Sequence, residues 1–187
     1  MLRHLPNLIT LARMGLCLPL AWAILDGQPL RALWLAAAIG MSDVLDGLLA
    51  RRFGWQSRLG GLLDPLADKL FLVSALVALA VAGVAPAWFV VLALLRDLVI
   101  VAGAVAYHNL VEPVQPEPRV LGKLNTLGEV LLVLVLLATM ADWPLPGIAA
   151  PALLALVTAL IVVSGADYVR TWSYRAMAIW QRRRESR

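Results

Sequence analysis

The chain is a succession of long apolar runs separated by short polar or proline-containing breaks. A membrane-spanning helix needs roughly 20 mostly apolar residues. Six runs meet this length, at about 6–25, 29–50, 60–82, 86–108, 121–141 and 148–169. Four of the five breaks hold typical turn residues, and these four are Asp26-Gly27-Gln28-Pro29, Gly83 to Pro86, Asp142-Trp143-Pro144 and the longer "HNLVEPVQPEPR". The pattern therefore predicts six transmembrane helices joined by short connections.

Composition supports an integral membrane protein. Of the 187 residues, 61% are hydrophobic and only 15% are charged, whereas soluble domains are about 45–50% apolar. The mean hydropathy is +0.83. Because the spans use nearly the whole chain, we expect an all-α, polytopic membrane protein with residues 1–187 in one domain. The net charge of +4 is concentrated in the basic tail 170–187, which suits an anionic lipid surface better than nucleic acid.

Basic residues outside the spans predict the orientation of the chain. They gather at alternate ends of the predicted spans, and they are Arg3, Arg51, Arg52, Arg58, Arg119, Arg175 and the tail "QRRRESR". The opposite ends have only Arg31. By the positive-inside rule, both termini face the cytoplasm of a cell whose inner membrane holds the protein. Cleavage of residues 1–23 as a signal peptide is the alternative, but Arg13 interrupts that apolar run and cleavage would leave an odd number of spans.

Four aspartates stand out within this apolar chain. Asp43 and Asp46 are three residues apart near the end of the second span, and Asp64 and Asp68 are four apart near the start of the third. Each spacing places both members on one face of a helix. Since two helices joined by a short loop are antiparallel neighbours, the two faces can converge at the cytoplasmic end.

Converging carboxylates need a positive partner, because otherwise they would repel one another and take up protons. Oxygen ligands without histidine or cysteine favour Mg²⁺ or Mn²⁺ over zinc. Four carboxylates are more than one magnesium ion normally takes from a protein, which favours two ions that clamp a phosphoryl group. A purely structural set of caps and salt bridges is the simpler alternative, but ionisable groups inside a membrane are usually functional.

The same residues match a known family signature at every fixed position. The segment from Asp43 to Asp68 resembles D-x2-D-G-x2-A-R-x8-G-x3-D-x3-D of the CDP-alcohol phosphotransferases. This resemblance implies a six-helix membrane enzyme, usually a homodimer, that transfers a substituted phosphate from a CDP-linked donor to an alcohol and releases CMP. It implies that Asp43, Asp46 and Asp64 hold the metals, and that Asp68 completes the site and acts as general base.

The resemblance also implies where the substrates bind. "PNLITLAR", from Pro6 to Arg13, is similar to the first helix of the family. The residues expected at the CDP-linked donor are Asn7, Thr10, Gly47, Ala50, Arg51, Ser57 and Gly60. An arginine in mid-span is costly when it faces lipid, so we expect Arg13 to point at the site. The residues expected near the acceptor's phosphate are Arg13, Arg96, Lys123 and Asn125, while Glu129, Asp167 and Arg170 are expected to form a structural contact between spans.

Resemblance alone indicates which donor and which acceptor the protein uses. "LLDPLADKL" is similar to the branch that makes phosphatidylglycerophosphate or cardiolipin, whose donor is CDP-diacylglycerol. "RDLVIVAGAVAY" and "GKLNT" look more like the CMP-forming cardiolipin synthases, which use phosphatidylglycerol. Glycerophosphate-using synthases typically have a second lysine where this chain has Asn125. Phosphatidylglycerol is therefore the favoured acceptor and glycerol 3-phosphate the alternative.

Two further alternatives belong to other classes of protein. A divalent-cation transporter would also place carboxylates in a membrane, but it needs polar residues through the full depth of the bilayer. The outer halves of the spans, such as "FLVSALVALAVAG" and "LLVLVLLATM", are almost purely apolar. An inactive family member would be expected to have lost an aspartate, and none is missing. The sequence therefore favours an enzyme.

Overall fold

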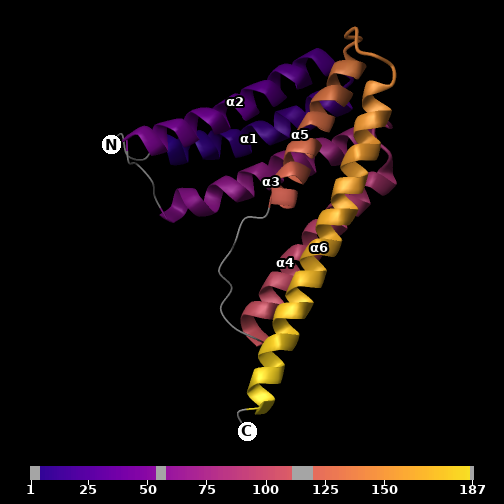
Figure 1. Ribbon diagram of the computed structural model, residues 1–187. Helices are drawn as coiled ribbons and strands as arrows, with labels where there is room; N and C mark the ends of the chain where they lie inside the picture. Colours follow the sequence, from indigo (N-terminus) through magenta and orange to yellow (C-terminus); the bar gives the residue numbers. More distant parts are fainter. Residues whose placement is uncertain (1–4, 54–57, 111–119, 186–187) are drawn as a thin grey trace. The chain divides into compact units, whose positions relative to one another are not determined.

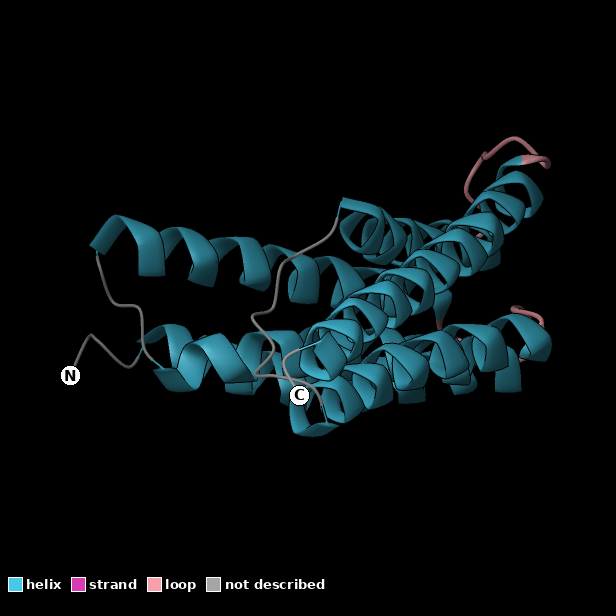
Figure 2. Cartoon of the chain, turned by 60° about the horizontal axis from the view of Figure 1, so that its bottom comes forward, coloured by secondary structure: helices cyan, strands magenta, loops and turns pink. Residues whose placement is uncertain are grey.

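The described residues form six helices, in the order that the hydrophobic pattern predicts (Figure 1). The computed structural model describes residues 5–53, 58–110 and 120–185, apart from the side chains of 5, 6, 44, 46, 47, 49–51, 53, 58–62, 110, 175, 176 and 178–185. The helices are α1 (Leu5–Leu25), α2 (Pro29–Phe53), α3 (Arg58–Val81), α4 (Ala87–Leu110), α5 (Val120–Met140) and α6 (Ala149–Glu185). The described residues contain no strand (Figure 2), so the all-α prediction is confirmed for them.

Helix α6 is longer than the span predicted for it. The apolar run was expected to end near residue 169, with a separate basic tail from 170 to 187. Instead one helix continues to Glu185, over 37 residues. No glycine or proline follows Gly165, so the sequence contains no residue that would end the helix there. The basic tail is therefore a continuation of the last helix.

Four of the helices contain stretches long and apolar enough to cross a membrane. These stretches are Asn7–Leu25, Ala87–Asn109, Val120–Met140 and Ala149–Tyr174. The remaining helices, α2 and α3, have 25 and 24 residues and contain the four aspartates. The chain is thus an all-helical protein with four candidate spans among its described residues. Six spans and two cytoplasmic termini stay predictions.

The helices divide into two compact units. Unit 1 contains α1, α2, α3 and the second part of α5, from residue 130. Unit 2 contains most of α4, the first part of α5 up to residue 129, and α6 from residue 151. The single domain expected over residues 1–187 stays a prediction.

In unit 1, helix α1 packs against both α2 and α3 (Figure 1). The side chains that make this core are almost fully buried, and they include Leu20, Ile24, Ala32, Ile39, Ala75 and Leu79. Several are alanines, whose small size lets helix backbones approach closely. Large apolar residues such as Leu18 and Trp22 lie on the opposite, exposed side of α1. This division between a tightly packed apolar core and an exposed apolar side suits a helix that faces lipid on one side.

Three predicted tight turns have the same helix-ending geometry. After α1, Gly27 has φ 66° and the Gln28 amide donates to the Ala23 carbonyl at 2.9 Å. After α3, Gly83 has φ 73° and the Val84 amide donates to the Leu79 carbonyl at 2.9 Å. These are Schellman motifs, in which a left-handed residue turns the chain back and satisfies the last carbonyls of the helix.

The turn after α5 uses the same motif without a glycine. Asp142 takes φ 55°, and the Trp143 amide donates to the Ala138 carbonyl at 3.0 Å. Aspartate tolerates this region better than most side chains because its short polar group can bond locally. The turn signals in the sequence therefore identified three helix ends correctly.

In unit 2, the first turns of α5 lie close to α6. A Cβ added to Gly128 would come within 3.0 Å of a Val157 methyl group. Helix α6 also lies beside α4, where the rings of Tyr107 and Trp172 meet edge to face with 5.1 Å between their centroids (Figure 1). A glycine in α5 and an aromatic pair thus fix the packing of α6 within this unit.

We expect Gly83→Ala to destabilise the protein while Gly40→Ala does not. Neither position has a heavy atom within 4 Å of an added Cβ, so the two differ mainly in backbone conformation, because only Gly83 has a positive φ. An alanine forced into the left-handed region costs about 1–2 kcal/mol. For a chain of this size we expect the melting temperature of the detergent-solubilised Gly83→Ala variant to fall by roughly 2–8 °C.

Gly40, in the interior of α2, is the matched control, since alanine is the better helix former there by about 1 kcal/mol. Equal melting temperatures for Gly83→Ala and the unmodified protein would contradict the role assigned to this turn.

Candidate active site

The largest of the most deeply buried side chains in the described structure belongs to an arginine in the middle of α1. Arg13 is only 1% exposed, and Thr10, one turn earlier on the same helix, is equally buried. Both lie on the side of α1 that packs against α2 and α3. Arg13 therefore points into the interior of unit 1, while its role at the acceptor's phosphate stays a prediction.

The Arg13 guanidinium binds carboxylates from two other helices. Its Nη1 donates to Asp43 Oδ1 on α2, and it donates to Asp68 Oδ1 on α3 at 3.1 Å. Its Nη2 lies 3.6 Å from Asp64 Oδ1, also on α3. The Thr10 hydroxyl donates to the same Asp64 oxygen at 2.9 Å. Three of the four signature aspartates thus converge on one residue of α1.

Helix geometry explains this convergence. Asp64 and Asp68 are one turn apart on α3, so their side chains extend from the same face. Asp43 comes from α2, on the other helix against which α1 packs. The side chains of these three aspartates are 47–48% exposed, whereas Arg13 is buried behind them. The result is a carboxylate-lined site with a guanidinium at its base and an accessible side.

The charges of this site suit a hard divalent cation. Three carboxylates and one guanidinium leave a net charge of about −2 (three negative, one positive) before Asp46 is counted. The donor atoms are all oxygens, which Mg²⁺ and Mn²⁺ prefer. Among the described side chains, no group of three potential ligands lies close enough together to hold a metal ion. The oxygen donors therefore suit such a cation. In this structure, however, the carboxylate oxygens of Asp43, Asp64 and Asp68 lie around the Arg13 guanidinium.

Most of the residues predicted to bind the CDP-linked donor have no described side chain. The backbones of α2 and α3 include Asp46, Gly47, Ala50, Arg51 and Gly60, but their side chains are not described. Ser57 lies outside the described residues altogether. Asn7 is half-buried on α1, one turn before Thr10. The assignment of these residues to the CDP-linked donor stays a prediction.

Arg96 lies in unit 2 and makes structural contacts there. Its Nε donates to the buried Ser164 hydroxyl at 3.2 Å, and its Nη1 donates to Asp97 Oδ1 at 3.0 Å. Its guanidinium carbon is 6.0 Å from the centre of the Tyr168 ring. Sequence reasoning missed these α6 partners. Their spacing was a usable signal, because Ser164 and Tyr168 are four residues apart and therefore share a helix face.

Asn125 and Lys123 differ in their surroundings although they are neighbours on α5. Asn125 is fully buried, and its Nδ2 donates to Glu129 Oε1 at 2.7 Å. Lys123 is exposed. Glu129 thus bonds to a residue one turn earlier on its own helix, and the structural contact expected between Glu129, Asp167 and Arg170 stays a prediction. The structure thus turns the amide nitrogen of Asn125 into the interior of unit 2.

Comparison with known proteins identifies the family. Residues 3–165 match the family described as CDP-alcohol phosphatidyltransferase. The chain is 38% identical over 132 residues to a cardiolipin synthase (CMP-forming) of Streptomyces coelicolor, a match covering 65% of this chain and 59% of that protein. It is 35% identical over 122 residues to a human cardiolipin synthase (CMP-forming), covering 64% of this chain and 39% of that protein.

Another relative differs in its acceptor. The chain is 32% identical over 127 residues to a CDP-diacylglycerol–glycerol-3-phosphate 3-phosphatidyltransferase of Aquifex aeolicus, a match covering 66% of this chain and 70% of that protein. By contrast, the chain spans less than two thirds of the length of the Streptomyces and human relatives. The family match extends over most of the chain and includes the aspartates around Arg13. The chain therefore belongs to the CDP-alcohol phosphatidyltransferase family.

Proposed function

We propose that this protein transfers a phosphatidyl group from CDP-diacylglycerol to the hydroxyl of a glycerol-containing acceptor and releases CMP. The observation that carries this proposal is the gathering of three signature aspartates around Arg13, on an accessible side of unit 1. Family membership favours an enzyme over a cation transporter. The named activities of the relatives, which include both acceptor types, support the reaction class.

We further propose that Asp43, Asp46, Asp64 and Asp68 hold Mg²⁺ or Mn²⁺ ions, two in number. The oxygen-only donors and the net negative charge around Arg13 support this assignment. When bound, the ions would neutralise charge that develops on the transferred phosphate. The chain itself contributes the fixed positions of the carboxylates, because the Arg13 guanidinium links Asp43 on α2 to Asp64 and Asp68 on α3.

Asp68 is the proposed general base. About half of its side chain is exposed (48%), so an acceptor hydroxyl can reach it, while Arg13 fixes one of its oxygens. Asp68 takes the hydroxyl proton as the hydroxyl oxygen forms a bond to the phosphatidyl phosphorus. The bond from that phosphorus to the CMP oxygen then breaks, and CMP leaves. Phosphoryl transfer of this kind relies mainly on positioning and charge neutralisation.

Phosphatidylglycerol is the proposed acceptor, on the resemblance of the fourth and fifth helices to cardiolipin synthases. Glycerol 3-phosphate is a second candidate for a specific reason. Asn125 was the residue expected to distinguish the two, yet its amide bonds to Glu129 inside unit 2. Residue 125 therefore gives little support to either acceptor. Arg96 and Lys123 keep their proposed role at the acceptor's phosphate.

The proposed location is the cytoplasmic membrane, with the site at its cytoplasmic face and the protein as a homodimer. Exposed tryptophans support a membrane boundary at the other end of unit 1. Trp22, Trp34 and Trp143 are 72%, 68% and 53% exposed, close to the turns after α1 and α5. Tryptophans concentrate at membrane–water interfaces, where an amphipathic ring can meet both phases.

Asp68→Asn should abolish turnover while leaving nucleotide binding largely intact. An amide cannot take the acceptor's proton, and general bases typically contribute about 10²–10⁴-fold to the rate. The measurement is CMP release together with binding of CDP by the purified variant. Asp142→Asn, an exposed acid in the turn after α5, is the control and should be fully active. Normal turnover in Asp68→Asn would remove Asp68 as the base.

Arg13→Met should lower both activity and stability, because three carboxylates lose their shared cation. Hydrogen bonds to charged groups contribute about 1.5–3 kcal/mol, so a fall of this order in the free energy of unfolding is expected. Mg²⁺ should raise the melting temperature of Arg13→Met by more than that of the unmodified protein. Arg52→Met, at an exposed arginine of α2, is the control and should behave like the unmodified protein.

The same variant distinguishes two roles for Arg13. If Arg13 bound the acceptor's phosphate and did not position the aspartates, Arg13→Met would raise the KM for the acceptor. Its response to Mg²⁺ would then equal that of the unmodified protein.

An assay of CMP release identifies the acceptor. The purified protein is incubated with CDP-diacylglycerol and Mg²⁺, and phosphatidylglycerol, glycerol 3-phosphate or no acceptor is added in parallel reactions. We expect release with phosphatidylglycerol alone. Release with glycerol 3-phosphate alone would identify the second candidate, and release with neither would contradict the proposed reaction.

A further inference from the structure

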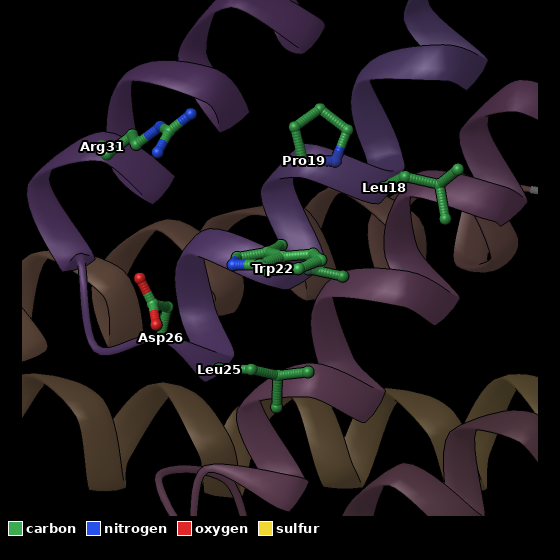
Figure 3. A pocket seen from close by; sticks show the side chains of 7 residues that line it. Leu18, Pro19, Trp22, Leu25, Asp26 and Arg31 are labelled. Carbon is green, nitrogen blue, oxygen red and sulfur yellow. The ribbon is translucent and has the colours of Figure 1, made fainter.

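A groove of about 960 Å³ lies along α1 at the end of unit 1 that is remote from the aspartates. Its lining comes from the last turns of α1 and the start of α2, and consists of Leu18, Pro19, Ala21, Trp22, Leu25, Asp26 and Arg31. In the view of Figure 3, Asp26 and Arg31 lie at one end of the groove, Leu18 lies at the other, and Trp22 lies between them. The groove is thus charged at one end and apolar along its length.

The apolar wall has the length of a lipid chain segment. Leu18 and Asp26 are eight residues apart, which corresponds to about 12 Å along a helix axis. Leu18, Trp22 and Leu25 are 78%, 72% and 54% exposed, so their side chains are available to an apolar ligand. Because α1 is a candidate span, this wall lies where bilayer hydrocarbon is expected.

The charged end is held in place by one side chain in the turn between α1 and α2. The side-chain Nε2 of Gln28 donates to Asp26 Oδ2, and Arg31 Nη1 donates to Gln28 Oε1 at 3.2 Å. Gln28 therefore bridges an acid and a base. The Schellman bonds of the same turn fix its backbone. This arrangement presents one positive and one negative group, with Gln28 between them, at one end of the groove.

We propose that this groove binds a zwitterionic phospholipid with a primary ammonium group, in the leaflet opposite the aspartate site. The Arg31 guanidinium has donors suited to a phosphodiester, and the Asp26 carboxylate can accept hydrogen bonds from an ammonium group. One acyl chain then lies along Leu18, Trp22 and Leu25. Trp22 is of the residue type that prefers this depth of a membrane.

Charge complementarity favours this lipid over other lipids. An anionic headgroup would place Asp26 beside a second negative charge. A choline headgroup has no N–H donor for the carboxylate. At this end of the predicted spans the sequence has no arginine or lysine other than Arg31, so the phosphate has one clear partner. The proposal concerns the end of unit 1 away from the aspartates and does not depend on the proposed reaction.

Native mass spectrometry of the full-length protein, titrated in detergent with phosphatidylethanolamine or phosphatidylcholine, tests the proposal. We expect phosphatidylethanolamine to be retained about tenfold better, the effect of roughly one charge-assisted hydrogen bond. Arg31→Gln should lower retention of both lipids by a similar factor, and Arg31→Lys should retain most of it. Asp26→Asn should remove the preference between the two lipids.

Asp142→Asn, an exposed acid at the end of α5 that does not line the groove, is the control and should bind like the unmodified protein. Melting temperatures of all variants identify any that fail to fold. Equal retention of the two lipids by the unmodified protein, or unchanged retention by Arg31→Gln, would overturn the proposal. Symmetric cross-linking of Leu18→Cys with lipid present would also overturn it, because a second copy of the chain would then occupy the groove.

Discussion

The arrangement of unit 1 depends on one electrostatic requirement, the neutralisation of Arg13 inside an apolar helix. A buried guanidinium is expensive unless it is paired and hydrogen-bonded. Asp43 on α2 and Asp68 on α3 both bond to it, with Asp64 close by, so α1 must pack against both helices at this level. Buried alanines in all three helices allow their backbones to approach closely. The requirement of one cation thus determines where three carboxylates meet.

The same contacts explain how three carboxylates can lie close together in an apolar chain. Carboxylates that lacked a fixed cation would repel one another and tend to become protonated. Arg13 reduces that repulsion but does not cancel it, because three negative charges face one positive charge. The remaining negative charge is what a divalent ion would bind. Arg13 therefore serves the proposed chemistry from behind the carboxylates, without needing to touch a substrate.

Unit 2 follows the same rule on a smaller scale. Two of its polar side chains within apolar helices bond to neighbours: Arg96 through Nε and Nη1 to Ser164 and Asp97, and Asn125 through Nδ2 to Glu129. The pairing of Asn125 gives it a structural explanation that its position in the sequence did not suggest. The identity of residue 125 can therefore reflect helix packing and need not report substrate choice.

The sequence by itself determined the order of the helices, the ends of α1, α3 and α5 and the identity of the acidic residues, but not the end of α6. Local features carry this information, because the length of an apolar run, the glycine of a Schellman turn and the spacing of Asp64 and Asp68 each act within a few turns. Two other facts depend on contacts between distant residues. Arg13 was expected to point at the site, yet its role as shared partner of Asp43, Asp64 and Asp68 required three helices to be packed together. The burial of Asn125 likewise could not be predicted, since periodicity in an almost wholly apolar helix does not tell which face meets protein and which meets lipid. Tertiary packing decided both, because the energy of a charge or an amide depends on the neighbours that replace water around it.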